Sequence, residues 1–239
     1  MSSITSQSWL QLSQNFVAHS TEKLSIENAI LQEIGELKKP IHILIIGPGA
    51  SNLPHELTKQ GHRVTIIEKE SHFANLYTQN PKITILQTDF EATFLKPESY
   101  DCIIASHVFY YFRDLVQSIQ KLRAGLKANG KIFLITNTST DFYAKTKRFF
   151  FEQLLHQSYF FTYDRLLTAF ATLDIPFIEK IIHCRVATDS TEHLYEILRV
   201  WFDTEQLAYN EHKTAMVAYL ANIGPEFSID SENRLLIIS

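Results

Sequence analysis

Five short apolar runs alternate with helix-like segments along the first half of this chain. They are Ile41–Ile46, Val64–Ile67, Ile83–Leu86, Cys102–Ala105 and Ile132–Thr136. This rhythm predicts right-handed strand–helix–strand crossovers and therefore a parallel sheet. Because the runs consist mostly of Ile, Leu and Val, we expect their strands to be buried on both faces, as in a doubly wound α/β fold.

Helices are expected before, between and after these runs. Ser25 can cap a first helix that ends at Pro40. Its apolar residues recur every three or four positions and are Ile26, Ile30, Ile34 and Leu37. The other predicted helices are Pro54–Gln60 (stopped by Gly61), Leu115–Leu126 (before an Asn129-Gly130 turn), Asp141–Gln157, Tyr163–Leu173, Thr191–Phe202 and Glu211–Asn222. Two late strands are predicted at Phe177–Arg185 and Leu235–Ile238, the last one after a turn at Asp230–Asn233.

Charge and composition exclude several classes of function. The net charge is −4, and the densest basic stretch, Lys145–Arg148, is short, so we expect no nucleic-acid partner. No stretch reaches the roughly 18 apolar residues that span a bilayer, and Met1–Leu12 has no basic start, so we expect no membrane association. Cys102 and Cys184 lie in apolar runs and are interpreted as packed rather than reactive thiols, which predicts a reducing, cytoplasmic location. The ten histidines show no metal-ligand spacing, and we expect no metal.

A glycine turn follows the first run. Gly47, Pro48 and Gly49 lead into a helix, where residues without side chains let the backbone turn sharply and a nucleotide approach closely. Glu68 ends the second run 19 positions after Gly49 and can accept hydrogen bonds from both ribose hydroxyls of an adenosine-containing cofactor. An ordinary turn and a solvated acid remain the alternatives.

The residue three positions after Gly49 decides between two cofactors. A dinucleotide site needs a third glycine there, for helix packing and access to a pyrophosphate. Asn52 stands at this position. A cofactor without phosphates has less use for that glycine, so the departure favours S-adenosylmethionine over NAD and makes a nicotinamide-dependent oxidoreductase the weaker alternative.

Two more segments directly follow predicted strands. They lie at the carboxyl edge of the predicted sheet, where open α/β sheets bind ligands. Asp89 can accept from an adenine amino group and Phe90 can flank the ring, although a helix cap explains Asp89 almost as well. The run from Ser106 to Phe112 follows the fourth strand and includes His107, Tyr110 and Tyr111. We place Ser106 with the cofactor residues and the others in an acceptor pocket; an aromatic core is the alternative.

The whole chain resembles the class I S-adenosylmethionine-dependent methyltransferases. That resemblance implies a Rossmann-like fold with a mostly parallel, seven-stranded sheet whose last strand is antiparallel. Three segments resemble the histamine N-methyltransferase family more closely: Phe16–Glu22 with its His-Ser-Thr-Glu, Tyr110–Asp114, and Pro225–Ser228 with its Pro-Glu-Phe-Ser. The helical insertion before the last strand has a counterpart there too.

The resemblance also assigns acceptor residues. It implies that Glu22 binds an amine substrate, with His19 in the same segment and Asn233 near the last strand. The family has a glutamine where this chain has His107, and its glycine turn is richer. These departures leave cofactor use intact but count against histamine itself as the acceptor.

We therefore expect one domain over residues 1–239, with an N-terminal helical cover (1–39), a cofactor-binding core (40–137), and substrate-side helices, an insertion and two last strands (138–239). The expected function is methyl transfer from S-adenosylmethionine to a small molecule, with an amine or imidazole nitrogen as acceptor, by a monomer. The expected catalytic residues are His107, Tyr110, Tyr111 and Glu22. An O-methyltransferase, a peptide or protein methyltransferase, and a non-catalytic S-adenosylmethionine-binding module remain alternatives.

Overall fold

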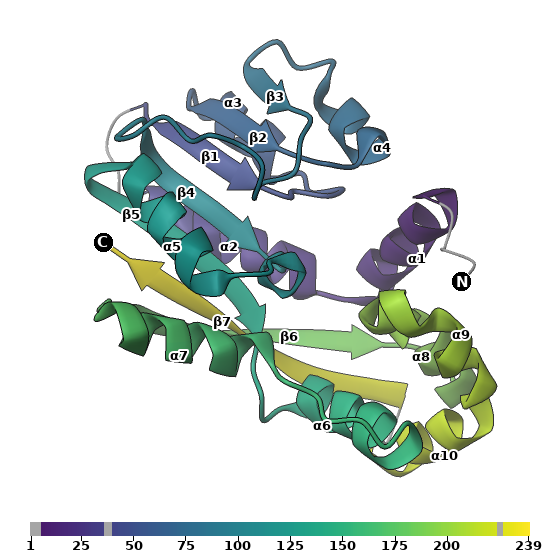
Figure 1. Cartoon of the computed structure of the whole chain (residues 1–239). Helices are drawn as coiled ribbons and strands as arrows, with labels where there is room; N and C mark the ends of the chain where they lie inside the picture. Colours follow the sequence, from purple (N-terminus) through teal and green to yellow (C-terminus); the bar gives the residue numbers. More distant parts are fainter. Residues whose placement is uncertain (1–5, 36–39, 224–226) are drawn as a thin grey trace. The chain divides into compact units, whose positions relative to one another are not determined.

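The computed structural model describes residues 6–35, 40–223 and 227–239 (Figure 1). Contacts between residues divide the chain into two compact units. Unit 1 consists of Met1–Ser25, Thr138–Tyr159 and His183–Glu232; unit 2 consists of Ile26–Asn137, Phe160–Ile182 and Asn233–Ser239. The single-domain organisation expected from the sequence stays a prediction.

The sheet has seven strands in the order β3-β2-β1-β4-β5-β7-β6. Their bounds are β1 His42–Ile46, β2 Arg63–Ile67, β3 Ile83–Leu86, β4 Tyr100–Ser106, β5 Leu126–Asn137, β6 Ile178–Ala187 and β7 Ser228–Ile238. The first five strands pair in parallel, and β7 is antiparallel to β5. The expected doubly wound α/β fold with a late antiparallel strand is confirmed.

Burial explains why the parallel strands could be predicted from the sequence. In β1 and β2 every residue after the first is buried. Strands covered on both faces have no solvent-facing positions. Their sequences are therefore continuous apolar runs and do not alternate between apolar and polar residues. All five predicted runs coincide with observed strands, with ends that differ by a few residues.

Helices of unit 2 pack against this sheet. They include α2 Glu22–Gly35, whose first residues belong to unit 1, with α3 Leu53–Lys59, α4 Ser71–Ala74, α5 Leu115–Gly125, α7 Thr162–Leu173 and the 3-10 turns η1 Asn75–Tyr77 and η2 Phe109–Tyr111. Ile119 of α5 and Leu166 of α7 join Leu44 and Ile103 of the strands in one buried cluster. Burying each such side chain is worth about 1.5–3 kcal/mol, so this cluster is a main source of stability.

Unit 1 is helical and has an aromatic core. Its helices are α1 Ser6–His19, α6 Phe142–Arg148, the π-helix η3 Phe149–Leu154, α8 Thr191–Leu198, η4 Arg199–Glu205, α9 Gln206–Glu211 and α10 Lys213–Ile223. The rings of Tyr195 and Tyr209 stack with centroids 4.6 Å apart. Each phenol donates to the other residue's backbone carbonyl, at 3.1 Å and 3.0 Å. The buried hydroxyls are thereby satisfied.

Three sequence-based boundaries are wrong. The turn expected at Asn129-Gly130 lies inside β5, which already begins at Leu126. Ser25 does not cap α2, which begins at Glu22, because Ser25 N–H already donates to the carbonyl of Thr21 within the first turn. The turn expected at 230–233 is instead part of β7. Its buried face carries Ser231 and Asn233 alongside Ile229, and these polar residues hid the strand alternation. Leu37, Pro225 and Glu226 lie outside the described residues.

One half-buried imidazole, that of His42, joins neighbouring strands at the amino end of the sheet. The His42 ring makes hydrogen bonds to the Ser99 carbonyl through Nδ1 (3.2 Å) and to Thr65 Oγ1 through Nε2 (2.9 Å). Burial, and next the charge of Arg63, lower the pKa of His42. The neutral ring, with one donor and one acceptor nitrogen, satisfies both contacts.

This site predicts how stability depends on pH. As the pH falls through about 6.5, His42 of the unfolded chain gains a proton while the folded protein still resists protonation. The unfolded state then binds more protons, so the free energy of unfolding should fall as the solution is acidified below that pH. Urea titrations at about pH 7 and pH 5.5 should show a smaller fall for His42→Asn than for the wild type. Equal falls would show that His42 contributes nothing.

Candidate active site

The two glycines of the turn after β1 are required for different reasons. Gly47 and Gly49 have φ of +57° and +55°, in the left-handed region that favours glycine. A Cβ on Gly47 would lie 2.6 Å from Val108 Cγ1, whereas a Cβ on Gly49 would meet nothing within 4 Å. Close packing therefore selects glycine at position 47, and the backbone at position 49 faces open space that a ligand can approach.

Glu68 lies beside this turn, directly after β2. Its side-chain oxygens accept hydrogen bonds from the backbone N–H of Gly49 (3.2 Å) and of Glu70 (2.9 Å). Glu68 is 6% exposed, and burial raises its pKa, although both backbone donors oppose the shift. A nearly buried carboxylate at this edge, held in one orientation, matches what two ribose hydroxyls need.

Two residues that hold the turn were missed by the sequence analysis. The Tyr77 hydroxyl donates toward the carbonyls of Gly49 (2.7 Å) and Ser51 (2.9 Å). Glu27, on α2, accepts from the Ser51 hydroxyl and from the Asn52 N–H. Neither residue belongs to a local motif, since Tyr77 lies 28 positions from Gly49 and Glu27 lies 24 from Ser51. Only the folded chain brings them together.

Asp89 and Phe90 follow β3 with different surroundings. Asp89 accepts from the Glu91 N–H at 2.8 Å and lies 3.6 Å from the Lys69 ammonium. The ring of Phe90 is 4% exposed, stacks on Phe112 at 4.9 Å, and lies 4.6 Å from Lys121 Nζ. Phe90 therefore contributes its ring to the core in this structure, and the adenine contact expected of it stays a prediction.

The segment after β4 separates buried from exposed aromatic rings. Phe109 and Phe112 are buried, whereas Tyr110 and Tyr111 are 46% and 54% exposed, with ring centroids 4.3 Å apart. His107 follows Ser106, the last residue of β4, and has φ of +54°. A left-handed non-glycine residue costs about 1–3 kcal/mol and is frequent at functional sites. This strain supports a role for His107 beyond packing.

The remaining predicted acceptor residues are divided between the units. In unit 1, His19 Nδ1 lies 2.9 Å from the Asn15 carbonyl oxygen, and the His19 ring meets the ring of His193 edge-on at 4.6 Å. Glu22 lies in the same unit, and its backbone N–H donates to Ser20 Oγ. In unit 2, Asn233 is buried and its side-chain Oδ1 accepts from Asn137 Nδ2 at 3.1 Å.

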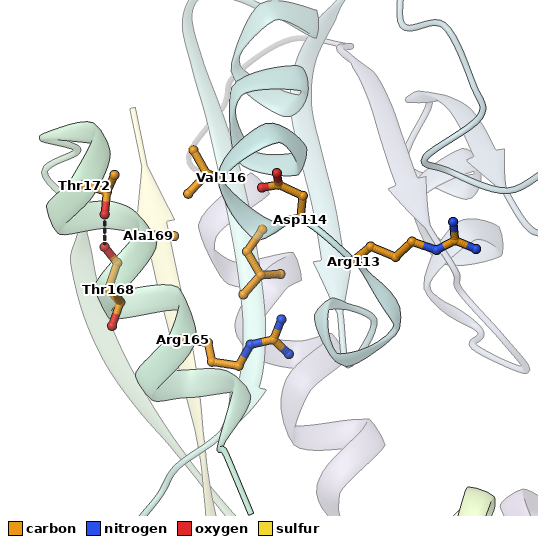
Figure 2. A pocket seen from close by; sticks show the side chains of 8 residues that line it. Arg113, Asp114, Val116, Arg165, Thr168, Ala169 and Thr172 are labelled. Carbon is orange, nitrogen blue, oxygen red and sulfur yellow. Dashed lines mark hydrogen bonds between the residues drawn. The ribbon is translucent and has the colours of Figure 1, made fainter.

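A surface hollow of about 300 Å³ lies between α5 and α7 (Figure 2). It is lined by Arg113, Asp114, Leu115, Val116, Arg165, Thr168, Ala169 and Thr172. Arg165 reaches toward the first turn of α5, whereas Arg113 extends away from it. None of the predicted cofactor or acceptor residues lines this hollow.

The described ranges hold neither a candidate membrane span nor a cluster of metal ligands. No helix there is long and apolar enough to cross a membrane. No group of three or more His, Cys, Asp or Glu side chains in the described part of the chain could hold a metal ion.

Comparison with known proteins identifies the fold and its cofactor. Residues 44–134, from β1 into β5, match a family model described as a methyltransferase domain. This segment contains the glycine turn and Glu68. These residues therefore belong to an S-adenosylmethionine-dependent methyltransferase domain. The open backbone at Gly49 and the oriented carboxylate of Glu68 fit this cofactor.

Solved structures share the fold of this methyltransferase at low identity. The YcgJ protein of Bacillus subtilis is 11% identical with a TM-score of 0.64, over 89% of this chain and 97% of that one. A protein of Anabaena variabilis, described as a methyltransferase from an antibiotic biosynthesis pathway, is 17% identical with a TM-score of 0.64, over 91% and 97%. Phosphoethanolamine N-methyltransferase 2 of Haemonchus contortus is 14% identical with a TM-score of 0.57, over 89% of this chain and 51% of that one.

One curated protein matches part of the chain. A polyketide synthase-nonribosomal peptide synthetase of Aspergillus clavatus is 36% identical over 76 residues, which are 31% of this chain. The match spans 2% of that protein's length. The activity of so large a protein therefore does not carry over to this methyltransferase.

Replacement of Glu68 tests the cofactor site. Because the carboxylate would lose charge-assisted hydrogen bonds to the ribose, Glu68→Ala should weaken S-adenosylhomocysteine binding by about 2–4 kcal/mol in calorimetry. Glu70→Ala, at the exposed acid two positions later, is the matched control and should bind as the wild type does. Unchanged affinity in Glu68→Ala, or micromolar NAD binding by the wild type, would contradict the assignment.

Proposed function

We propose that this methyltransferase transfers a methyl group to the nitrogen of a small amine or imidazole. The observation that carries the proposal is the acidic surrounding of the N-terminal segment in unit 1. Burial raises the pKa of Asp141, and the charges of Glu232 and Glu22 raise it further. The negative charges of Glu22 and Glu232 beside Asp141 create a negative potential, which favours a cationic ammonium.

The segment that carries Glu22 is anchored in unit 1. The Thr21 N–H donates to the Arg185 carbonyl at 2.9 Å, and the Arg185 N–H donates to Thr21 Oγ1 at 2.9 Å. These bonds fix the start of α2 against β6, so Glu22 presents its carboxylate from an ordered first turn. The resemblance to the histamine N-methyltransferase family gives this glutamate a substrate role, and we propose the same role here.

Similarity in fold adds support for a small-molecule acceptor. The Haemonchus enzyme is named an N-methyltransferase and was solved with phosphomonomethylethanolamine, a small amine, and S-adenosylhomocysteine. We propose a small-molecule nitrogen acceptor for this chain as well. The residues proposed to act on it are Glu22 and His19, which belong to unit 1, and His107, Tyr110, Tyr111 and Asn233, which belong to unit 2.

The chemistry needs little acid–base machinery. S-adenosylmethionine supplies a methyl group already activated on a sulfonium, so the protein's task is alignment and exclusion of water, worth up to roughly 7–11 kcal/mol. Glu68 and Asp89 would hold the adenosine, and Glu22 would bind an ammonium of the acceptor. The attacking nitrogen must be unprotonated. A secondary or primary nitrogen releases one proton on methylation, and we assign its acceptance to His107, because imidazole changes protonation near neutral pH.

Monomeric state and a cytoplasmic location complete the proposal. Cys102 and Cys184 are both buried free thiols, and burial raises the pKa of Cys102. Protonated, inaccessible thiols accord with a reducing compartment. Sedimentation and fractionation would test these two points.

The acceptor class depends on Glu22. Amines, imidazoles, phenols and carboxylates would be screened with labelled S-adenosylmethionine against the wild type and Glu22→Gln. The wild type should prefer cationic amines or imidazoles, and the variant should lose that preference by at least roughly tenfold, the equivalent of about 1.4 kcal/mol. Exclusive methylation of phenols or carboxylates would favour an O-methyltransferase. Absence of turnover with every acceptor, despite cofactor binding, would favour a non-catalytic binding module.

The role of His107 separates catalysis from packing. If the imidazole accepts the acceptor's proton, His107→Ala should lower kcat by about 10²-fold or more while the dissociation constant of S-adenosylhomocysteine stays near the wild-type value. His107→Asn is the better-folded companion, since asparagine also tolerates the left-handed backbone found here. Joint loss of cofactor binding and activity in both variants would indicate a structural residue.

A further inference from the structure

We propose that Tyr77 and Glu27 form a clamp on the glycine turn and act as positioning residues for S-adenosylmethionine. Both side chains bind the turn itself and neither belongs to the predicted cofactor set. The clamp concerns the cofactor, so its test is independent of which acceptor is methylated.

Tyr77 fixes one side of the turn. The residue is 1% exposed, and its hydroxyl lies 2.7 Å from the Gly49 carbonyl oxygen and 2.9 Å from that of Ser51. Burial raises the pKa of the phenol, so the group stays protonated and remains a donor. The Gly49 N–H is meanwhile held by Glu68. Both polar groups of the Gly49 peptide backbone are therefore bound by side chains from the segment after β2.

Glu27 fixes the other side. Its Oε1 accepts from the Ser51 hydroxyl at 2.6 Å and from the Asn52 N–H at 3.1 Å. Asn52 occupies the cap position of α3, and its side chain makes no capping hydrogen bond within the described structure. Ser51 Oγ in turn accepts from the N–H of Leu53, the first residue of α3, at 3.1 Å. Glu27 therefore orients the serine that supports the start of α3. The turn is held at Gly49, Ser51 and Asn52 by residues far away in the sequence.

The segment that carries Tyr77 is held against α3 by contacts of its own. Asn80 Nδ2 donates to Thr58 Oγ1 at 2.9 Å, and the Tyr77 ring lies 5.4 Å from the ring of His55. These contacts join the segment after α4 to α3. Tyr77 therefore acts from a fixed position rather than following the turn as it moves.

Holding the turn affects ligand binding because glycine has the greatest backbone freedom of any residue. A turn with left-handed residues at Gly47 and Gly49 would otherwise sample many conformations, and a ligand would have to order it on binding. A turn that is already ordered removes that cost and raises affinity. Loss of the clamp should thus weaken cofactor binding even though neither residue needs to touch the cofactor.

The test compares two substitutions that each remove one buried tyrosine hydroxyl, one in each unit. Tyr77→Phe keeps the ring and removes one buried hydroxyl that donates to backbone carbonyls. Tyr209→Phe removes an equally buried hydroxyl that donates to the Tyr195 carbonyl at 3.0 Å in unit 1. Both variants should unfold at a lower temperature. Only Tyr77→Phe should raise the calorimetric dissociation constant of S-adenosylhomocysteine, by roughly fivefold, the scale of one hydrogen bond.

Two substitutions of Glu27 test the clamp independently of Tyr77. Glu27→Gln keeps an amide oxygen that can accept from Ser51 and Asn52, whereas Glu27→Ala removes it. Affinity for S-adenosylhomocysteine should be near wild type in the first variant and fall roughly fivefold in the second. Hydrogen exchange of the cofactor-free protein should speed up at residues 49–52 in Glu27→Ala and Tyr77→Phe.

Two results would overturn the clamp. The first is wild-type cofactor affinity in Tyr77→Phe. The second is an equal loss of affinity in Tyr209→Phe, which would indicate a general effect of stability. If Tyr77→Phe does not fold, the Glu27 pair decides alone, and equal affinities of Glu27→Ala and Glu27→Gln would reject the proposal.

Discussion

Parallel pairing of β1 with both β2 and β4 is the constraint on which the site depends. Ile46 at the end of β1 is in register with Ile67 of β2 and with Ala105 of β4. The residues that follow these partners therefore meet at one edge: Gly47, Glu68 and Ser106. The strand order also reverses at β1, the point where open α/β sheets bind ligands. A glycine, a carboxylate and a serine meet there because three strands end together, and His107 follows the serine directly.

The two units divide the chemical work between them. Unit 2 provides backbone geometry and hydrogen bonds, since its site consists of a turn, a buried carboxylate and the donors around them. Unit 1 provides negative charge around Asp141, whereas its stacked Tyr195–Tyr209 pair is buried in its core. A nucleoside needs a fixed pattern of donors and acceptors, whereas an ammonium needs negative charge. The composition of each unit suits one of the two ligands proposed for this enzyme.

The sequence was informative wherever burial was uniform and silent wherever contacts were distant. The five parallel strands, the glycine turn and Glu68 could be predicted, because each leaves a local pattern. Strand β7 was placed too late because Ser231 and Asn233 occupy its buried face. Tyr77 and Glu27 could not be found, since their hydrogen bonds span 20 or more positions and leave no periodicity. The packing of the Phe90 ring depended on Phe112 and Lys121, which the order of residues does not bring together.

The different surroundings of the two glycines bear on how this turn can diverge in evolution. Gly47 is restricted twice, by its left-handed backbone and by the contact that a Cβ would make with Val108. Gly49 is restricted only by its backbone, because a Cβ there would meet open space. Asparagine and aspartate tolerate the left-handed region better than other residues with side chains. Among descendants of this chain, position 49 can therefore drift to these residues and alter the cofactor's surroundings, while position 47 stays glycine.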